Sequence, residues 1–333
     1  MKVVIAPDSF KESLPANEVA EAIKRGFKRV IPDAECLLLP VGDGGEGTVD
    51  AIKSSLGLEE KTVQVTGPFG DEVLMSYFQK RELALFEVAN LVGLAKIPFE
   101  KRNPLEIQTK GIGQLILHLI EQGIKDIYVG VGGTASNDGG IGIASGLGYQ
   151  FYDKNGIVLQ ANGQSLVDIR KILKEGVIQI PSDVHIKILA DVTNPLCGEL
   201  GCSAVFGPQK GATKEMVQDM DAWLNSFSNL VKEKYKDADS TYPGCGAAGG
   251  LGYAFHNFTN SKMESGIQIV LDETRLEDYV KDADIVVTGE GRLDSQTVMG
   301  KAPVGVANIA KKYNKKVIAF SGSVTEDAGV CNE

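Results

Sequence analysis

The chain has 333 residues, 43% of them hydrophobic and 23% charged, and a formal net charge of −10 at pH 7. At roughly 150 residues per domain this length predicts two domains, and the ordinary composition excludes a disordered, collagen-like or coiled-coil chain. The negative charge, without a basic stripe, predicts no nucleic-acid partner. No signal-peptide pattern opens the chain and no segment reaches the roughly 18 apolar residues of a membrane span, so we expect a soluble, cytoplasmic protein with no membrane partner.

Strands and helices alternate at the start of the chain. Short β-rich runs at 3–6 and 36–41 are each followed by apolar residues at helical spacing, over 19–30 and 49–56. Both strands are apolar throughout, which is typical of a parallel sheet buried on its two faces. Three closely spaced strands then predict antiparallel pairing and a domain boundary. They are expected at 62–66, 72–79 and 83–89.

The last third of the chain repeats the opening pattern, with a strand at 284–288, a helix at 302–313 and a strand at 316–320. We therefore predict an α/β fold of two domains. A Rossmann-like parallel sheet, discontinuous over 1–65 and 280–333, is interrupted by an inserted α/β domain over 66–279 that has some antiparallel strands. The elements expected inside the insertion are helices at 105–121, 138–148 and 214–234 and strands at 126–131 and 186–190.

Polar loops follow several predicted strands, at the ends where open α/β sheets bind ligands. The first strand leads into Asp8, Ser9 and Lys11, a carboxylate, a hydroxyl and an ammonium close to a predicted helix start. These groups suit phosphate, and we expect Lys11 to act in catalysis. A capping box between Ser9 and Glu12 is the purely structural alternative.

The second strand leads into a glycine-rich loop at 42–48 that carries two acids. Its glycines leave backbone N–H groups free to approach an anion at a helix N-terminus. Asp43 and Glu46 alone would repel a phosphate, so they predict a bridging hard cation such as Mg²⁺. The residues expected to contact phosphate here are Gly44, Gly45, Gly47 and Thr48.

A third loop, at 132–140, follows the strand expected at 126–131. Its hydroxyl and amide groups beside glycines suit the oxygens of a phosphate or a hydroxy acid. Asn137 or Asp138 could instead simply cap the following helix; we expect Asp138 to be a further metal ligand. The residues expected to bind phosphate or substrate here are Gly133, Thr134, Ser136 and Asn137.

Two further loops end β-rich runs with acids, at 191–195 and 288–297. No Walker A or dinucleotide fingerprint and no His-Glu-x-x-His motif occurs, so general base catalysis falls to carboxylates. We predict Asp191 as the base and Asp294 as the metal- or substrate-side carboxylate, with the two roles open to exchange, because each follows a buried strand and neither has an adjacent lysine. The binding residues expected in these loops are Asn194, Gly289, Gly291 and Arg292.

Glycine and cysteine contents add two expectations. The 39 glycines predict many positions with positive φ or with backbone close to a ligand. The five cysteines, an odd number, fit free thiols in a reducing compartment.

Five motifs resemble, in chain order, those of the bacterial glycerate kinase type I family, which is distinct from the P-loop and protein kinases. They are Ala-Pro-Asp-Ser-Phe-Lys at 6–11, Asp-Gly-Gly-Glu-Gly-Thr at 43–48, Gly-Gly-Thr-Ala-Ser-Asn-Asp-Gly-Gly at 132–140, Asp-Val-Thr-Asn-Pro at 191–195 and Thr-Gly-Glu-Gly-Arg-Leu-Asp at 288–294.

The resemblance implies ATP-dependent phosphorylation of glycerate with Mg²⁺, 2-phosphoglycerate being favoured over 3-phosphoglycerate, and an active site in the cleft between two α/β domains. The chain departs from the family at Glu12, where a glycine is expected. It also ends at 333, soon after the strand at 316–320, whereas relatives continue through further α/β elements, so we expect a C-terminally shortened chain.

Two other functions fit the same residues. One is a kinase or phosphatase acting on another small hydroxy acid, and the other is a non-catalytic regulator that binds a nucleotide or metabolite. An assay of ADP release across short acids would separate them. Self-association into a homo-oligomer is left open by the sequence.

Overall fold

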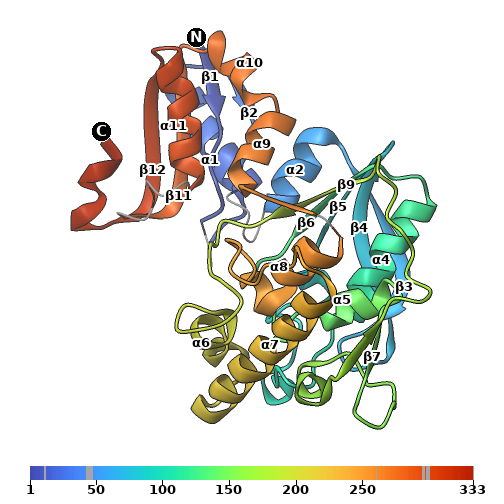
Figure 1. Ribbon diagram of the computed structural model, residues 1–333. Coiled ribbons are helices and arrows are strands. Elements are labelled where there is room, and N and C mark those ends of the chain that lie inside the picture. The colour runs from blue at the N-terminus through green and yellow to red at the C-terminus, as the bar shows by residue number, and fades with distance from the viewer. Residues whose placement is uncertain (11–12, 43–47, 260, 295–296, 298–300, 333) are drawn as a thin grey trace. The chain divides into compact units, whose positions relative to one another are not determined.

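The computed structural model describes residues 1–333 except 11–12, 43–47, 260, 295–296, 298–300 and 333 (Figure 1). The chain forms two compact units. Unit 1 comprises Met1–Leu58 together with Glu264–Glu333, and unit 2 comprises Glu59–Met263. Each unit has its own main β-sheet. Within the described ranges no helix is both long and apolar enough to cross a bilayer.

The sheet of unit 1 has four parallel strands in the order β12-β11-β1-β2. Val3 of β1 is opposite Ile285 of β11 on one side and Cys36 of β2 on the other. The two ends of the chain therefore share one parallel sheet, which confirms the predicted fold class. The strands are β1 (Lys2–Ile5), β2 (Glu35–Leu38), β11 (Ile285–Leu293) and β12 (Lys316–Val324).

Among the described residues, unit 1 contains five α-helices. One contacts β1 and β2, and another runs along β11 and β12, as Figure 1 shows. The apolar residues Val3, Ile5 and Val287 of the strands pack with Ala20 and Ala34 in the core of this unit. The helices are α1 (Ala16–Val30), α2 (Thr48–Leu56), α9 (Gly266–Glu273), α10 (Leu276–Lys281) and α11 (Ala302–Lys312), and a 3₁₀ segment follows at Glu326–Asn332.

The main sheet of unit 2 has six strands in the order β10-β9-β6-β5-β4-β3. β5, β6 and β9 are parallel, whereas β3, β4 and β5 pair antiparallel, with Arg81 at φ 54° in the β4–β5 hairpin. A separate two-stranded ribbon pairs β7 with β8. The strands are β3 (Glu59–Thr66), β4 (Glu72–Lys80), β5 (Leu83–Glu87), β6 (Asp126–Gly130), β7 (Gln150–Tyr152), β8 (Lys171–Leu173), β9 (His185–Leu189) and β10 (Lys262–Glu264).

The helices of unit 2 enclose a large apolar core. α4 packs on β3 and against α5. That helix pair is close: a Cβ on Gly113 would lie 2.2 Å from the Ile143 carbonyl oxygen, and one on Gly146 would lie 2.3 Å from that of Lys110. The α-helices are α3 (Ala89–Val92), α4 (Lys110–Glu121), α5 (Ile141–Gly146), α6 (Cys202–Phe206), α7 (Lys214–Lys234) and α8 (Ala247–Phe258), and 3₁₀ helices lie at Phe99–Lys101, Gly163–Asp168 and Pro208–Lys210.

The unit boundaries differ from the expected limits of 65/66 and 279/280. Strand β3 pairs along its whole length with β4, so it belongs to unit 2 from Glu59 onward. Helices α9 and α10 pack against each other and against α11, and this places them in unit 1. The helix expected over 105–121 begins only at Lys110.

Candidate active site

The strand order of unit 1 contains a topological switch point between β1 and β11. From β1 the chain crosses to β2 on one side, and from β11 it crosses to β12 on the other. Ligands of open α/β sheets bind outside the carboxyl ends of the strands at such a point. Two predicted motifs meet there, because the Asp8 N–H donates to the Gly289 carbonyl at 2.8 Å and the Thr288 hydroxyl donates to the Ala6 carbonyl at 2.9 Å.

The motif after β1 lies in a loop and not at the start of a helix. Asp8 is only 3% exposed, and its carboxylate accepts the N–H of Ser9 at 2.6 Å. Helix α1 begins at Ala16 with Pro15 at its N-cap, so Ser9 does not cap it. Glu12, the other residue of the proposed capping box, lies outside the described residues. Lys11, expected in catalysis, lies outside the described residues.

Strand β11 continues further than expected. Gly289, Gly291 and Arg292 were predicted in a loop, but they lie within β11, where Gly289 pairs with Phe320 and Arg292 with Ser323 of β12. These residues form a strand because they pair in parallel with β12, which is equally long. The hydrogen bonds of this pairing outweigh the tendency of glycine to form turns. The motif is thus rigid up to Leu293.

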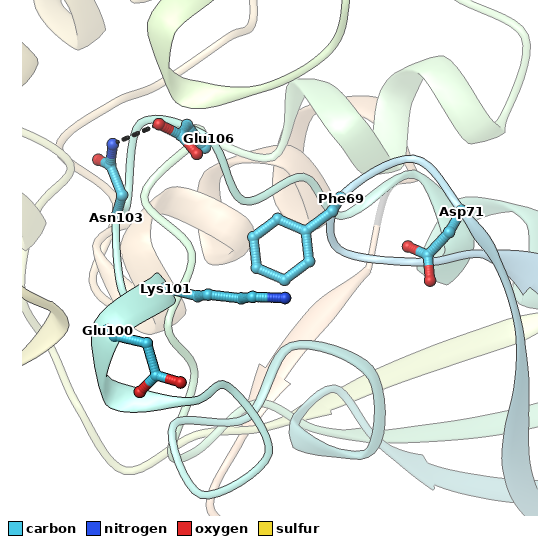
Figure 2. A pocket seen from close by; sticks show the side chains of 6 residues that line it. All are labelled: Phe69, Asp71, Glu100, Lys101, Asn103 and Glu106. Carbon is cyan, nitrogen blue, oxygen red and sulfur yellow. Dashed lines mark hydrogen bonds between the residues drawn. The ribbon is translucent and has the colours of Figure 1, made fainter.

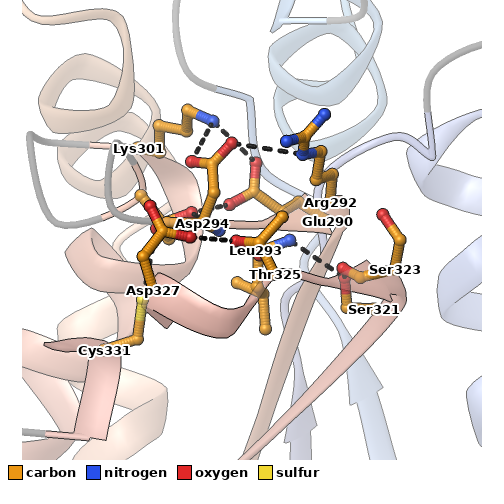
Figure 3. A network of polar contacts seen from close by, with 11 residues as sticks. Glu290, Arg292, Leu293, Asp294, Lys301, Ser321, Ser323, Thr325, Asp327 and Cys331 are labelled. Atoms are coloured by element: carbon orange, nitrogen blue, oxygen red, sulfur yellow. Dashed lines mark hydrogen bonds and ion pairs between the residues drawn. The ribbon is translucent and has the colours of Figure 1, made fainter. Parts of the chain in front are cut away.

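A network of charged side chains follows at the carboxyl end of β11 (Figure 3). The Lys301 ammonium lies 3.7 Å from the Glu290 carboxylate and 3.6 Å from that of Asp294, and Arg292 approaches Asp294 at 3.4 Å. The Thr297 hydroxyl donates to Glu290 at 2.8 Å. Asp294 has no lysine directly beside it in the sequence, but Lys301, a few residues further along the chain, lies between the two acids and gives Asp294 a structural partner.

The backbone around Asp294 is fixed from several sides. The Leu293 N–H donates to the Ser321 hydroxyl at 3.2 Å, and the Thr325 N–H donates to the Leu293 carbonyl at 3.1 Å. The Cys331 thiol lies 3.6 Å from the Asp294 carbonyl, and burial raises the pKa of that thiol. Asp294 itself is 16% exposed, so its carboxylate is accessible while its main chain is held.

In unit 2, two predicted loops share one edge of the sheet. β6 and β9 are adjacent and parallel, so loop 132–140 and the segment 191–195 both leave from carboxyl ends at that edge. Asp191 is exposed there. Asn194 is half-buried. Its side-chain amide donates to the Leu200 carbonyl at 2.8 Å, and its main-chain carbonyl accepts the N–H of Gly246 at 2.8 Å.

Loop 132–140 carries buried polar atoms that lack partners within the described part of the chain. They are the hydroxyl oxygens of Thr134 and Ser136 and the amide oxygen of Asn137. The Asn137 amide nitrogen, by contrast, donates to the Ser203 hydroxyl at 2.9 Å. Gly133, expected to bind phosphate or substrate, has φ +67°, a left-handed conformation that glycine adopts readily. Unsatisfied buried polar groups are uncommon and call for a function.

Asp138 is fully buried beside these atoms. One of its oxygens accepts the hydroxyl of Thr109 at 2.7 Å and the Thr109 N–H at 3.2 Å, and the other accepts the Gly140 N–H at 2.9 Å. Burial raises the pKa of Asp138 to about 6, against these hydrogen bonds, which lower it. Asp138 therefore ties the loop to the starts of α4 and α5, which includes the capping role considered above.

Sequence reasoning missed Lys210, a lysine that is only 1% exposed. Its ammonium donates to the Ser136 carbonyl at 2.6 Å, and burial lowers its pKa to about 8 while the charge of Asp138 acts to raise it. The available signal was its position between glycines in Gly-Pro-Gln-Lys-Gly at 207–211. Lys301 was also missed, and the acids Glu290 and Asp294 that it joins were the signal for it.

The magnesium site expected at Asp43 and Glu46 lies outside the described residues, as do Gly44, Gly45 and Gly47. Thr48 opens α2 and is 1% exposed. Among the described residues no group of three or more His, Cys, Asp or Glu side chains is arranged to hold a metal ion. The metal role of Asp138 stays a prediction, and its oxygens already accept protein hydrogen bonds.

A surface cavity of about 590 Å³ in unit 2 contains none of the predicted site residues (Figure 2). The Lys101 ammonium lies over the Phe69 ring, 5.9 Å from its centroid. Three carboxylates against one ammonium make this cavity unfavourable for a phosphate chain. Its lining residues are Phe69, Asp71, Glu100, Lys101, Asn103 and Glu106.

The comparisons with known proteins agree with this geometry. The model of the glycerate kinase family matches residues 3–333. A glycerate kinase from Neisseria meningitidis serogroup B is 58% identical over 98% of this chain and 87% of its own length, and a glycerate 2-kinase from Escherichia coli K12 is 44% identical over 100% and 88%. A crystal structure from Salmonella typhimurium LT2 that carries the name glycerate kinase 2 superposes with a TM-score of 0.89 at 45% identity, over 98% of this chain and 88% of that one.

An α/β fold whose sequence and structure match kinases over nearly their whole length defines an enzyme of the kinase class. Within that class, the chain belongs to the glycerate kinase family.

Proposed function

We propose that this protein transfers the γ-phosphoryl group of ATP to glycerate and that 2-phosphoglycerate is the product. The observation that carries the proposal is the switch point of unit 1, where the motif at Asp8 and Ser9 meets the end of β11 beside the network of Glu290, Asp294 and Lys301. Family membership supports glycerate as the acceptor, and the name of the Escherichia coli relative supports the 2-position.

The proposed mechanism is in-line phosphoryl transfer, in which positioning and charge neutralisation supply most of the catalysis. Lys11 and Arg292 neutralise phosphate oxygens. Asp43 and Glu46, with Asp138, are the proposed ligands of Mg²⁺, which supplies further positive charge when bound.

The acceptor hydroxyl must lose its proton as the phosphoryl group arrives. We propose that Asp191 takes this proton and that Asp294 lies on the metal or substrate side. Asp191 is exposed at the carboxyl edge of the unit 2 sheet, and Asp294 is 16% exposed at the carboxyl edge of the unit 1 sheet.

Loop 132–140 is proposed to receive the hydroxy acid. The hydroxyls of Thr134 and Ser136 and the amide oxygen of Asn137 are buried and without partners among the described residues, so a ligand with several oxygens could satisfy them. Asn194, which begins the next turn at the same sheet edge, is proposed to assist. A hydroxy acid offers both donors and acceptors, which a bare phosphate does not.

The first experiment measures ADP release with ATP and a panel of short acids that includes D-glycerate, L-lactate and tartronate. Turnover with D-glycerate that stops in excess EDTA is expected. The ³¹P spectrum of the product identifies the regiochemistry, because phosphorus on the 2-oxygen couples to one proton and phosphorus on the 3-oxygen couples to two. Turnover restricted to another acid would favour the alternative substrate, and ATP binding without turnover would favour a regulator.

The second experiment assigns the carboxylates. Removal of a general base lowers the rate by about 10² to 10⁴, so Asp191→Asn is expected to lower kcat by that factor at unchanged ATP affinity. Lys11→Ala is expected to weaken ATP binding mainly. If Asp191→Asn turns over normally while Asp294→Asn is inactive, the two roles are exchanged.

A further inference from the structure

The Gly207–Gly211 segment contains a charge that the proposed mechanism does not use. Lys210 ends a 3₁₀ helix at Pro208–Lys210, and its side chain is 1% exposed. Its ammonium donates to the Ser136 carbonyl at 2.6 Å, a contact between residues 74 positions apart. Lysines are almost never fully buried unless they are paired, so this burial needs a compensating role.

Burial of this ammonium is costly, and filling the same space with an apolar side chain would avoid the cost. Replacement of buried charges by hydrophobic residues of similar volume is often neutral or stabilising. Desolvation lowers the pKa of Lys210 to about 8, with Asp138 and Cys202 as the groups that act in the opposite direction. Stability alone therefore does not account for a lysine at this position.

The contact is made where the main chain of loop 132–140 is most crowded. A Cβ on Gly249 would lie 2.1 Å from the Ser136 carbonyl oxygen and 2.9 Å from the Lys210 ammonium. The Gly139 N–H donates to the Gly249 carbonyl at 3.0 Å on the other side of the same turn. The Ser136 carbonyl is thus clamped between the ammonium and the α8 backbone, and its direction sets those of the neighbouring side chains.

The side chains on either side of that carbonyl are those with unpaired atoms. Thr134, Ser136 and Asn137 each have a buried oxygen without a partner among the described residues. A shift of the peptide that follows Ser136 would turn the side chains of Ser136 and Asn137, the two residues that this peptide joins. Displacement of a binding group by 1 Å can cost on the order of 10² in rate.

We propose that Lys210 is a positioning residue for the hydroxy-acid subsite: its buried ammonium, anchored on the Ser136 carbonyl, holds loop 132–140 in the conformation that presents Thr134, Ser136 and Asn137 to the substrate. The inference rests on the proposed function, because it assigns the acid rather than the nucleotide to this loop. Lys210 does not touch the reacting atoms and acts through the loop.

The test compares Lys210→Met with the wild-type protein in steady-state kinetics. The KM for D-glycerate is expected to rise so that kcat/KM for glycerate falls by about 10- to 100-fold, while the KM for ATP stays within about twofold. A loss of folded protein alone would lower kcat and leave both KM values unchanged. Lys234→Met is the matched control, since Lys234 also donates to a backbone carbonyl of unit 2, that of Ile172, and is expected to leave both KM values unchanged.

Amide hydrogen exchange supplies a readout that needs no activity. Exchange in loop 132–140 is expected to accelerate in Lys210→Met, while the hairpin of β3 and β4 stays as protected as in the wild type. An inactive wild type would refute the proposed function, and the exchange result would still decide the role of Lys210. Unchanged KM for glycerate together with unchanged exchange overturns the inference.

If Lys210→Met does not fold, Lys210→Arg decides. Its guanidinium keeps the charge but cannot reproduce the short contact beside Gly249, so the KM for glycerate is expected to rise in that variant as well. A folded Lys210→Arg variant with wild-type KM for glycerate overturns the inference.

Discussion

Asp138 makes the stability of unit 2 depend on pH in an unusual direction. Its carboxyl is fully buried, and its pKa is raised from the ordinary value of 3.8 to about 6. The folded state therefore binds this proton more tightly than the unfolded state does. Well below pH 3.8 the group is neutral in both states and carries no penalty; as the pH rises through 3.8 toward 6 the unfolded carboxyl ionises first, and folding becomes less favourable.

The magnitude follows from the interval between 3.8 and about 6. At about 1.36 kcal/mol per pKa unit the complete effect is on the order of 3 kcal/mol, of which about 2 to 3 kcal/mol falls between pH 4 and pH 7. The variant Asp138→Asn cannot titrate. The free energy of unfolding of the wild type, relative to that of the variant, is therefore expected to fall by this amount over that range. Lys210, with a pKa of about 8, stays protonated throughout and adds only a constant offset.

Urea unfolding at pH 4, 5, 6 and 7 in the presence of EDTA measures this difference. The fluorescence of Trp223, the single tryptophan, reports on unit 2 because the indole packs against its core. Asp183→Asn is the control with the opposite sign, since its hydrogen bond from Lys125 lowers the pKa of Asp183. A wild-type advantage over Asp138→Asn that is flat or grows with pH would refute the reasoning.

Two further predictions, one for each unit, compare a substitution at a close contact with a control substitution. Gly249→Ala adds a Cβ at φ +74° and 2.1 Å from a backbone oxygen, whereas its control Gly156→Ala adds one at φ +80° in open space. In urea unfolding, the free energy of unfolding should fall by about 1 kcal/mol in Gly156→Ala and by at least about 2 kcal/mol more in Gly249→Ala. Equal losses in the two variants would contradict the predicted clash. Lys301→Met leaves two carboxylates without the cation between them, so calorimetry should show a loss on the order of 1 kcal/mol that shrinks in high salt. Lys312→Met, which breaks an exposed pair, should cost less, and the reverse order would exclude the network as a stabilising feature.

The parallel sheet of unit 1 could be predicted where short apolar runs alternate with helical periodicity, as at β1 and the first residues of β11. The polar second half of β11 could not, because it is a strand only through its pairing with β12. The sequence also did not predict α8 at Ala247–Phe258. Four of the first six residues of that helix are glycine or take left-handed φ values, including Ala248 at φ 55° and Gly250 at φ 90°. Helix propensity alone disfavours such a start. Ala248, Gly249 and Gly250 have left-handed φ values and form a kink, so the regular part of α8 follows them, and the glycines let the kinked backbone pack directly on loop 132–140.

The excess of glycine has a second cause that composition could not separate from ligand binding. Gly113 and Gly146 do not bend the chain and do not approach a predicted ligand. They allow α4 and α5 to pack with backbone against backbone, and any side chain at either position would meet a carbonyl oxygen. Some glycines of this chain thus support the site only by bringing together the helices that carry it, since the Asp138 carboxylate links the starts of the same two helices.

The cations of the site were harder to predict than its acids, for a reason that follows from sheet topology. Acids and hydroxyls directly follow strands, so a local pattern identifies them. Neither lysine directly follows a strand: Lys301 is the N-cap residue of α11, and Lys210 ends a 3₁₀ helix and contacts a residue 74 positions away in the sequence. Lys301 supplies a positive charge to Glu290 and Asp294. Lys210 anchors the backbone of the loop that carries the buried oxygens without partners. Arg292 lies between the two acids in the sequence and approaches Asp294, but Lys301 is the cation that approaches both acids, and this becomes visible only in the fold.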